Sequence, residues 1–179
     1  MGVWFTQIQS GALKLPRFQR FEAWDRARVA GFLNTVVENL PVGVTLLLQV
    51  GDQEQFISRH IVTAPDTGAR VTEHLLDGQQ RLTAFWRAMH NNYEGETFYI
   101  HLREFDRSVQ AQAEGPDEED ETPLLSIHCQ PRWVKQKEQG TRYPVWADVP
   151  ARCLERGLVP VDLLCPGVGA DLNLTHPAD

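Results

Sequence analysis

The sequence predicts an α+β fold, in which a small mixed sheet packs against helices. Three observations carry this prediction. Apolar residues recur at helical spacing between residues 26 and 40, a continuous apolar run occupies residues 44–50, and a second helical pattern begins at residue 79, directly after a β-rich segment. The composition agrees, because 42% of the 179 residues are hydrophobic and 9% are aromatic, which suits one domain with a substantial core.

The chain begins with an extended segment that leads into the first predicted helix. Residues 11–24, GALKLPRFQRFEAW, read as extended because Pro16 disfavours helix in the residue before it. Asp25 is a suitable N-cap for the helix that follows, and Pro41 and Gly43 end that helix. Its apolar stripe consists of Val29, Phe32, Leu33, Val36, Val37 and Leu40.

Three β-rich segments and a second helix come next. The run 44–50 has the length and apolarity of a buried strand. Residues 55–64 and 69–76 are predicted to form two strands joined by a turn at PDTG, residues 65–68. A helix then begins at Gln79 and is expected to end at His90. Its buried face is marked by Leu82, Phe85, Trp86 and Met89.

The second half of the chain is less regular. Residues 97–105 and 123–130 are predicted strands, and residues 143–157 begin extended and continue into a short helix. Residues 111–122 are predicted to be a flexible acidic insertion between the two strands. The last residues, 166–179, are rich in Pro and Gly and have no regular period, which predicts a tail or a linker.

The formal net charge of −7 comes mostly from one place. Six acidic side chains lie within residues 113–122, and without them the net charge would be about −1. Residues 14–28 and 132–142 each carry a net charge of +3. Two patches of this size can hold a polyanion locally, but neither resembles a histone-like arm.

The cysteines and the hydropathy indicate a cytoplasmic protein. Cys129, Cys153 and Cys165 are too far apart for a zinc knuckle, and an odd number without a secretory signal predicts reduced thiols. No apolar run approaches the roughly 20 residues of a membrane span. We therefore expect no membrane partner.

The clearest chemistry lies in DGQQR, residues 77–81, at a predicted strand-to-helix corner. The first N–H groups of a helix that begins at Gln79 lack intrahelical partners, and the helix dipole makes this end positive. Gly78 lets a phosphate approach the backbone closely, and Arg81 offers a planar fork of donors. The corner is therefore predicted to bind the phosphates of a nucleotide or a nucleic acid.

The other side chains of the corner allow several roles. Gln79 and Gln80 can orient a base, a sugar or an attacking water, because an amide both donates and accepts. Asp77 would repel a phosphate directly, so it would hold Mg²⁺ or a ribose hydroxyl, or position Arg81. The same residue types also suit an ordinary helix start, which leaves a purely structural role open.

A second polar element lies upstream, in LPRFQR, residues 15–20. Arg17, Gln19 and Arg20 alternate with apolar or conformationally fixed residues, which would place them on one side of an extended segment. If this segment crosses the start of the helix, Gln19 and Arg20 would form a second clamp on the phosphates. Otherwise it would be an exposed basic strand.

Together the two elements closely resemble the DGQQR-motif domain, the N-terminal half of GmrSD-type modification-dependent restriction proteins and of related phage-defence proteins. The ordered match spans residues 6–90, with DGQQR intact at 77–81 and Pro-x-x-Gln-Arg intact at 16–20. Beyond residue 95 the likeness weakens to a strand pattern and to YPVWADV, residues 143–149. The resemblance implies a ParB/sulfiredoxin-like fold.

The resemblance also implies a nucleoside triphosphate-binding and -hydrolysing domain that regulates a DNA endonuclease. The implied cofactor is Mg²⁺ with a nucleoside triphosphate whose base is not specified. The implied catalytic residues are Asp77, Gln79, Gln80 and Arg81, with Asp77 also holding the metal. The implied nucleotide- and phosphate-binding residues are Gln19, Arg20, Gly78 and Arg81.

Members of this family commonly continue into an HNH-type nuclease half, and the sequence contains no convincing His-Asn-His arrangement. We therefore expect residues 1–165 to be the DGQQR-type nucleotide-binding domain, and residues 166–179 to be a tail or a linker to an absent C-terminal region. The nuclease would be a further domain or a partner subunit. DNA would be reached through that full-length protein or partner.

Two other functions stay open at this point. The same corner would serve a non-catalytic module that binds a nucleotide or a DNA backbone, or a ParB-like DNA nuclease that uses the corner itself. A nuclease needs a cluster of metal-binding acids, whereas the motif contains a single acid, Asp77. For hydrolysis, Glu73 is a reserve general base because it would share the strand face of Asp77, whereas His74 would lie on the opposite face.

Overall fold

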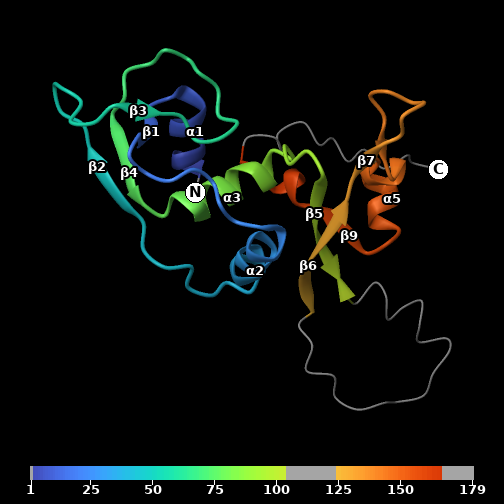
Figure 1. The fold of residues 1–179 in the computed structure, drawn as a ribbon. Helices are drawn as coiled ribbons and strands as arrows, with labels where there is room; N and C mark the ends of the chain where they lie inside the picture. The colour runs from blue at the N-terminus through green and yellow to red at the C-terminus, as the bar shows by residue number, and fades with distance from the viewer. Residues whose placement is uncertain (1, 104–123, 167–179) are drawn as a thin grey trace, which may run out of the picture.

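The computed structural model describes residues 2–103 and 124–166, and places two small sheets on either side of helix α3 (Gln79–Met89) (Figure 1). Both sheets share one hydrophobic core around this helix. Trp86 of α3 belongs to the same buried cluster as Phe5 near the N-terminus, and as Phe98 and Val161 from the C-terminal part. The predicted α+β class is confirmed.

The N-terminal sheet has four strands in the order β2-β4-β1-β3. β4 is parallel to β1 and antiparallel to β2, and β3 is antiparallel to β1, so the sheet is mixed, as predicted. The central strand β4 leads directly into α3, and its His74 and Leu75 side chains are fully buried. The strands are β1 (Leu13–Pro16), β2 (Leu46–Gln49), β3 (Ser58–Arg59) and β4 (Glu73–Asp77).

The predicted pairing of residues 55–64 with residues 69–76 is wrong. β3 pairs with β1, and β1 lies between β3 and β4. The backbone N–H groups of Thr72 and Glu73 both donate to the Ala12 carbonyl, at 2.9 and 3.1 Å, which fixes the entry of β4 beside β1. Two strand-like segments joined by a turn need not pair with each other, because a strand from an earlier part of the chain can lie between them.

The run 44–50 was predicted to be a buried strand; the strand is present as β2, but the predicted burial is wrong. Its strand β2 lies at the edge of the sheet, and Leu46 is 55% exposed. Continuous apolarity is typical of strands covered on both faces, but here only part of the run faces the core.

The two predicted helices are confirmed. Helix α2 (Arg26–Val37) begins after Asp25, whose Oδ1 accepts a hydrogen bond from the Arg28 backbone N at 2.9 Å. Helix α3 ends at Met89 with His90 as its C-cap. The apolar residues predicted for the inner face of α3 are all buried: Leu82, Phe85, Trp86 and Met89.

An N-terminal helix, α1 (Gly2–Ser10), was not predicted. Its buried residues are Phe5 and Ile8, and the Phe5 ring lies 5.3 Å from the Trp86 ring, centroid to centroid. A helix this short is stabilised by tertiary packing rather than by intrinsic propensity. The packing partner is remote in sequence, so the local sequence of residues 2–10 does not by itself indicate a helix.

The C-terminal part contains a three-stranded antiparallel sheet in the order β6-β5-β9, a two-stranded ribbon and short helices. Two predicted strands and the short predicted helix are confirmed as β5, β6 and α5. The acidic insertion 111–122 and nearly all of the predicted tail lie outside the described residues. The elements are β5 (Glu96–Leu102), β6 (Leu125–Pro131), β7 (Trp133–Val134), β8 (Arg142–Tyr143), η1 (Val145–Asp148), α5 (Pro150–Leu154), β9 (Leu158–Pro160) and η2 (Val161–Leu164).

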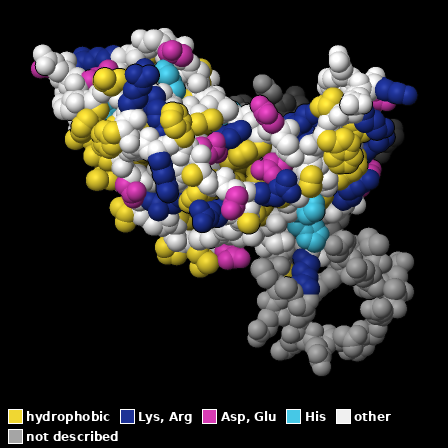
Figure 2. All heavy atoms as spheres, viewed as in Figure 1, with side chains coloured by type: hydrophobic (Ala, Val, Ile, Leu, Met, Phe, Trp, Pro, Cys, Tyr) yellow, Lys and Arg dark blue, Asp and Glu magenta, His cyan; other side chains and the backbone are white. Residues whose placement is uncertain are grey.

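The visible surface is chemically mixed. Lys and Arg side chains are interspersed with acidic and hydrophobic ones on the face shown in Figure 2. Within the ranges that the structure covers, no helix has both the length and the apolarity needed to cross a membrane.

Candidate functional site

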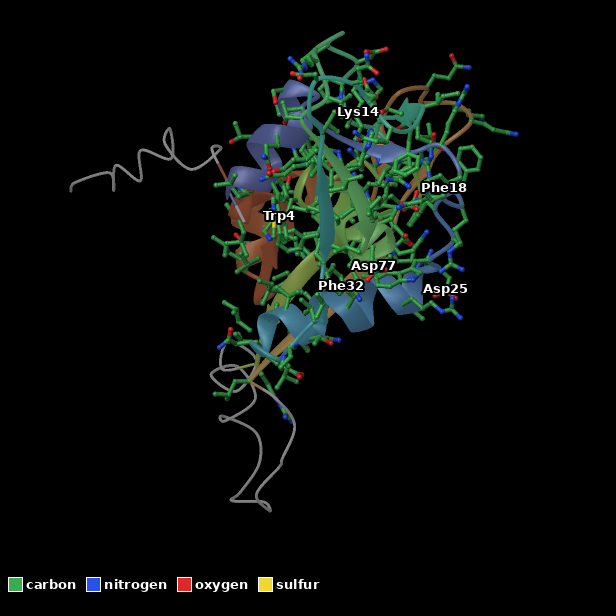
Figure 3. The ribbon with its side chains drawn as sticks, turned by 90° about the vertical axis from the view of Figure 1, so that its left-hand side faces the viewer. Trp4, Lys14, Phe18, Asp25, Phe32 and Asp77 are labelled. Carbon is green, nitrogen blue, oxygen red and sulfur yellow. The ribbon has the colours of Figure 1, made fainter. Side chains whose placement is uncertain are left out.

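The strand-to-helix corner is made by a single residue. β4 ends at Asp77, α3 begins at Gln79, and Gly78 between them has a φ of +94°, which L-residues rarely adopt. In the part of the chain that the structure describes, no side chain caps the helix start, so the first N–H groups of α3 remain available to a ligand. Figure 3 labels Asp77 at the end of its strand.

Gly78 also has close neighbours. A Cβ at this position would lie 3.1 Å from Thr45 Oγ1 and 3.3 Å from Arg81 Nη2. Gly43 approaches the same guanidinium from the other side, since its Cβ would lie 2.9 Å from Arg81 Nη1. The absence of a Cβ at both glycines therefore makes room for the Arg81 guanidinium.

Gly78→Ala is expected to destabilise the protein by about 1–2 kcal/mol from the left-handed backbone and by roughly 1 kcal/mol more from crowding against Thr45 and Arg81. Gly140→Ala is the matched control, because Gly140 has a φ of +90° with nothing within 4 Å of its Cβ position. Chemical denaturation of both variants measures the difference. Equal destabilisation would show that the close contacts at Gly78 contribute nothing.

An extended segment, residues 19–24, crosses the start of α3 and is held there by the two glutamines of the motif. Both amide atoms of Gln80 bind backbone groups of this segment, so in this arrangement Gln80 positions the chain. The three bonds run from Gln79 Nε2 to the Arg20 carbonyl (2.8 Å), from Gln80 Nε2 to the Phe21 carbonyl (3.1 Å), and from Ala23 N to Gln80 Oε1 (2.9 Å).

Gln19 attaches the same segment to the central strand. Its Nε2 donates to the carbonyls of Leu75 and Leu76, at 2.6 and 2.9 Å. Its Oε1 is buried and accepts no hydrogen bond within the described ranges. Buried acceptors are nearly always paired, so Gln19 Oε1 is an exception among the polar atoms of this segment.

Two arginines differ sharply in their surroundings. Arg81 donates from Nη2 to the Val44 carbonyl and, at 3.3 Å, to Asp77 Oδ2. Arg20 is exposed, and its guanidinium has no hydrogen-bond or ion-pair partner among residues 2–103 and 124–166. All its side-chain donors are therefore available for a ligand.

Arg59 is a residue of this site that the sequence did not indicate. Its Nη2 donates to the carbonyls of Gln19 (3.3 Å) and Arg20 (2.8 Å), and its guanidinium lies 4.9 Å from the centre of the Phe21 ring. Burial lowers the pKa of Arg59, although an arginine stays charged at neutral pH. Arg59 reaches segment 19–24 from β3, whose pairing with β1 was not predictable.

The corner and the crossing segment enclose a cavity of about 320 Å³, within the ~300–1,000 Å³ range of ligand pockets. Residues 77–81, Gln19 and Arg20 all line it, so the two predicted elements meet at one place. Two arginine side chains face one carboxylate, which makes the lining net positive. The lining consists of Gln19, Arg20, Trp24, Leu76, Asp77, Gly78, Gln79, Gln80 and Arg81.

Asp77 fits a single-carboxylate magnesium site. Its side chain is 71% exposed at the edge of the cavity. No three His, Cys, Asp or Glu side chains gather as a metal-ligand cluster in the described part of the chain. Mg²⁺ at this place would therefore have one protein ligand and take the rest from phosphate oxygens and water, as is usual for magnesium nucleotides.

Neither Glu73 nor His74 lines the cavity. His74 is fully buried, with its Nε2 2.7 Å from Ser58 Oγ. Glu73 begins the central strand, at the end opposite to Asp77. The structure therefore places the reserve general base away from the corner.

Comparison with known protein families identifies the chain. Residues 1–143 match the family described as the GmrSD restriction endonuclease, N-terminal domain. The chain belongs to this family. The match contains the corner and the crossing segment, and it extends beyond residue 95, where the likeness in the sequence is weaker. No curated protein and no solved structure matches the chain, so the ParB/sulfiredoxin-like topology stays a prediction.

Proposed function

We propose that this domain binds a nucleoside triphosphate with Mg²⁺ in the cavity and hydrolyses its terminal phosphate, thereby regulating the DNA endonuclease of a restriction system. One observation carries the proposal. The Arg20 guanidinium, which has no partner among the described residues, the Arg81 side chain, the start of α3, which no described side chain caps, and the Asp77 carboxylate all line one cavity. Helix N-termini and arginine forks are the groups that proteins use to bind phosphates.

The proposed roles follow from the contacts of each side chain. Arg20 and Arg81 stabilise the negative charge that develops on the terminal phosphoryl group. Asp77 holds magnesium, which neutralises phosphate charge when it is bound. Gln79 uses its Nε2 on the Arg20 carbonyl, which leaves its Oε1 to position the attacking water. Gln80 keeps segment 19–24, and with it Arg20, against the helix start.

The nuclease and the DNA belong to another part of the system. The family is the N-terminal domain of a restriction endonuclease, and we propose that cleavage is carried out by an HNH-type domain or partner subunit. The nucleotide state of the cavity would license that nuclease. We further expect the protein to act in the cytoplasm, where its three free cysteines would stay reduced.

A second candidate is a module that binds the nucleotide without hydrolysing it. It is favoured by the composition of the cavity wall, in which Asp77 is the only His, Asp or Glu among the described residues. Asp77 is engaged by Arg81 and is assigned to magnesium, so the described lining offers no separate general base for the proposed phosphate site. A ParB-like nuclease that uses the corner itself is disfavoured, because it requires a cluster of metal-binding acids.

Phosphate release separates the two candidates. We expect wild-type protein with Mg²⁺ to release phosphate from at least one of the four ribonucleoside triphosphates, and Asp77→Ala and Arg81→Ala each to reduce that rate by about 100-fold or more. Asp52→Ala, an exposed acid that does not line the cavity, should retain the wild-type rate. Background release by the wild type, together with thermal stabilisation by nucleotide, would establish the binding module instead.

A further inference from the structure

A second and larger cavity adjoins the first at Trp24. It has a volume of about 810 Å³ and lies between the start of α2, the end of α3 and the sheet of β5 and β6. Trp24 lines both cavities. Its half-buried ring packs edge-to-face on Phe32 at 5.6 Å, centroid to centroid, which holds the indole in one orientation.

The charges of the second cavity disfavour a phosphate. Its two arginines are already paired, Arg87 Nη1 with Glu22 Oε2 at 2.6 Å and Arg26 Nε with Glu96 Oε2 at 2.5 Å. A third carboxylate, Asp25, also lines it, so the wall is net negative. The first cavity, with Arg20 and Arg81, has the opposite sign.

The remaining polar groups of the second cavity are neutral. Burial raises the pKa of the Cys129 thiol to about 12, and burial also raises the pKa of the Tyr93 phenol. A cavity with an aromatic wall, a neutral thiol and phenol, and carboxylate oxygens left over from the ion pairs suits an uncharged planar group with an amino group, which offers two N–H donors.

We infer that the second cavity seats the base of the nucleotide, stacked on Trp24, with an exocyclic amino group directed toward the carboxylates, while the triphosphate occupies the first cavity. This inference rests on the proposed phosphate site. It identifies the ligand as a nucleoside triphosphate with an amino-bearing base, namely adenine, guanine or cytosine. Inorganic polyphosphate and a DNA backbone would use only the first cavity.

Competition binding tests the base seat in the wild-type protein. Displacement of a fluorescent nucleotide is measured with the four Mg²⁺-nucleoside triphosphates and with Mg²⁺-tripolyphosphate. We expect the best nucleotide to bind at least 10-fold more tightly than tripolyphosphate, because aromatic stacking adds affinity for the base. Uridine triphosphate, whose base has no exocyclic amino group, should bind most weakly of the four.

Variants locate the effect at Trp24. Trp24→Leu should reduce the preference for nucleotide over tripolyphosphate to less than about 2-fold, and Trp24→Phe should retain most of it, because phenylalanine still stacks. The control is Trp133→Leu, at a tryptophan that is 53% exposed on the β7–β8 ribbon. Thermal melts verify that each variant is folded. If Trp24→Leu does not fold, the base seat is tested by Trp24→Phe and by the comparison of nucleotide with tripolyphosphate in the wild type.

The outcomes separate the two proposals. Equal affinity of the wild type for nucleotide and tripolyphosphate would overturn the base seat and leave the phosphate site standing. A folded Trp24→Leu variant that keeps the full preference would overturn it as well. Tight binding of uridine triphosphate would overturn the role of the carboxylates, and failure to bind either ligand would overturn both the base seat and the phosphate site.

Discussion

Arg20→Ala is expected to reduce phosphate release by on the order of 1,000-fold, the scale of an arginine that stabilises a transferring phosphoryl group. The melting temperature should stay within about 1 °C of the wild type, because the Arg20 guanidinium has no partner in the described chain whose loss would cost stability. Among the described residues, the Arg20 contact that supports the fold is made by its backbone carbonyl, which accepts from Gln79 and Arg59. The combination of a large kinetic effect with unchanged stability is specific to a ligand-facing residue.

The matched control is Arg17→Ala. Arg17 is exposed, lies three residues upstream and does not line the cavity, so the loss of one positive charge near the site is common to both variants. Arg20→Lys keeps the charge but loses the planar fork, and should fall between Arg20→Ala and the wild type. If Arg20→Ala and Arg17→Ala had the same rate, Arg20 would have no specific contact with the phosphates.

Gln80→Leu is expected to lower the free energy of unfolding by about 1–3 kcal/mol, because it leaves the backbone groups of Phe21 and Ala23 without their partner. Nucleotide affinity should fall with it, by about 10-fold, since segment 19–24 then no longer fixes Arg20 over the helix start. Urea unfolding and a nucleotide titration measure the two effects. Leucine retains the size of the buried side chain, so the hydrogen bonds are what changes.

Gln53→Leu is the control for this substitution, because Gln53 is exposed, lies outside both motifs and does not line the cavity. Its stability should change by less than about 0.5 kcal/mol. A different combination of stability and activity in Gln80→Leu would change the role assigned to Gln80. Lost phosphate release with unchanged stability would return it to the direct catalytic role that the DGQQR resemblance implies.

The parts of the site that were predictable from sequence are those that depend on local chain chemistry. An acid, a glycine and polar residues after a β-rich run specify a strand-to-helix turn, and Gly78 does adopt the conformation that the turn needs. The meeting of Gln19 and Arg20 with residues 77–81 was predicted as a possibility, and the structure brings them into one cavity. The predicted alternation also placed Arg17 on the side of Gln19 and Arg20, but Arg17 does not line the cavity.

The parts that were missed depend on strand order and on contacts between distant segments. β1 separates β3 from β4, so the predicted hairpin does not form, and Arg59 reaches the crossing segment from an unexpected neighbour. Helix α1 needs Trp86 as its packing partner, more than 75 residues away. A ligand-facing role was also predicted for Gln80, whereas its amide binds backbone groups of Phe21 and Ala23. The periodicity of the sequence does not reveal such contacts between distant segments.

Calorimetric titration tests the central claim most directly: the cavity of Arg20 and residues 77–81 is the seat of a triphosphate. Wild-type protein should bind one Mg²⁺-nucleoside triphosphate per chain, and a double variant, Arg20→Ala with Arg81→Ala, should lose at least 100-fold in affinity while remaining folded. Undiminished binding by the folded double variant would place the nucleotide elsewhere. Absence of binding by the wild type, with all four nucleotides at millimolar concentration, would contradict the account altogether.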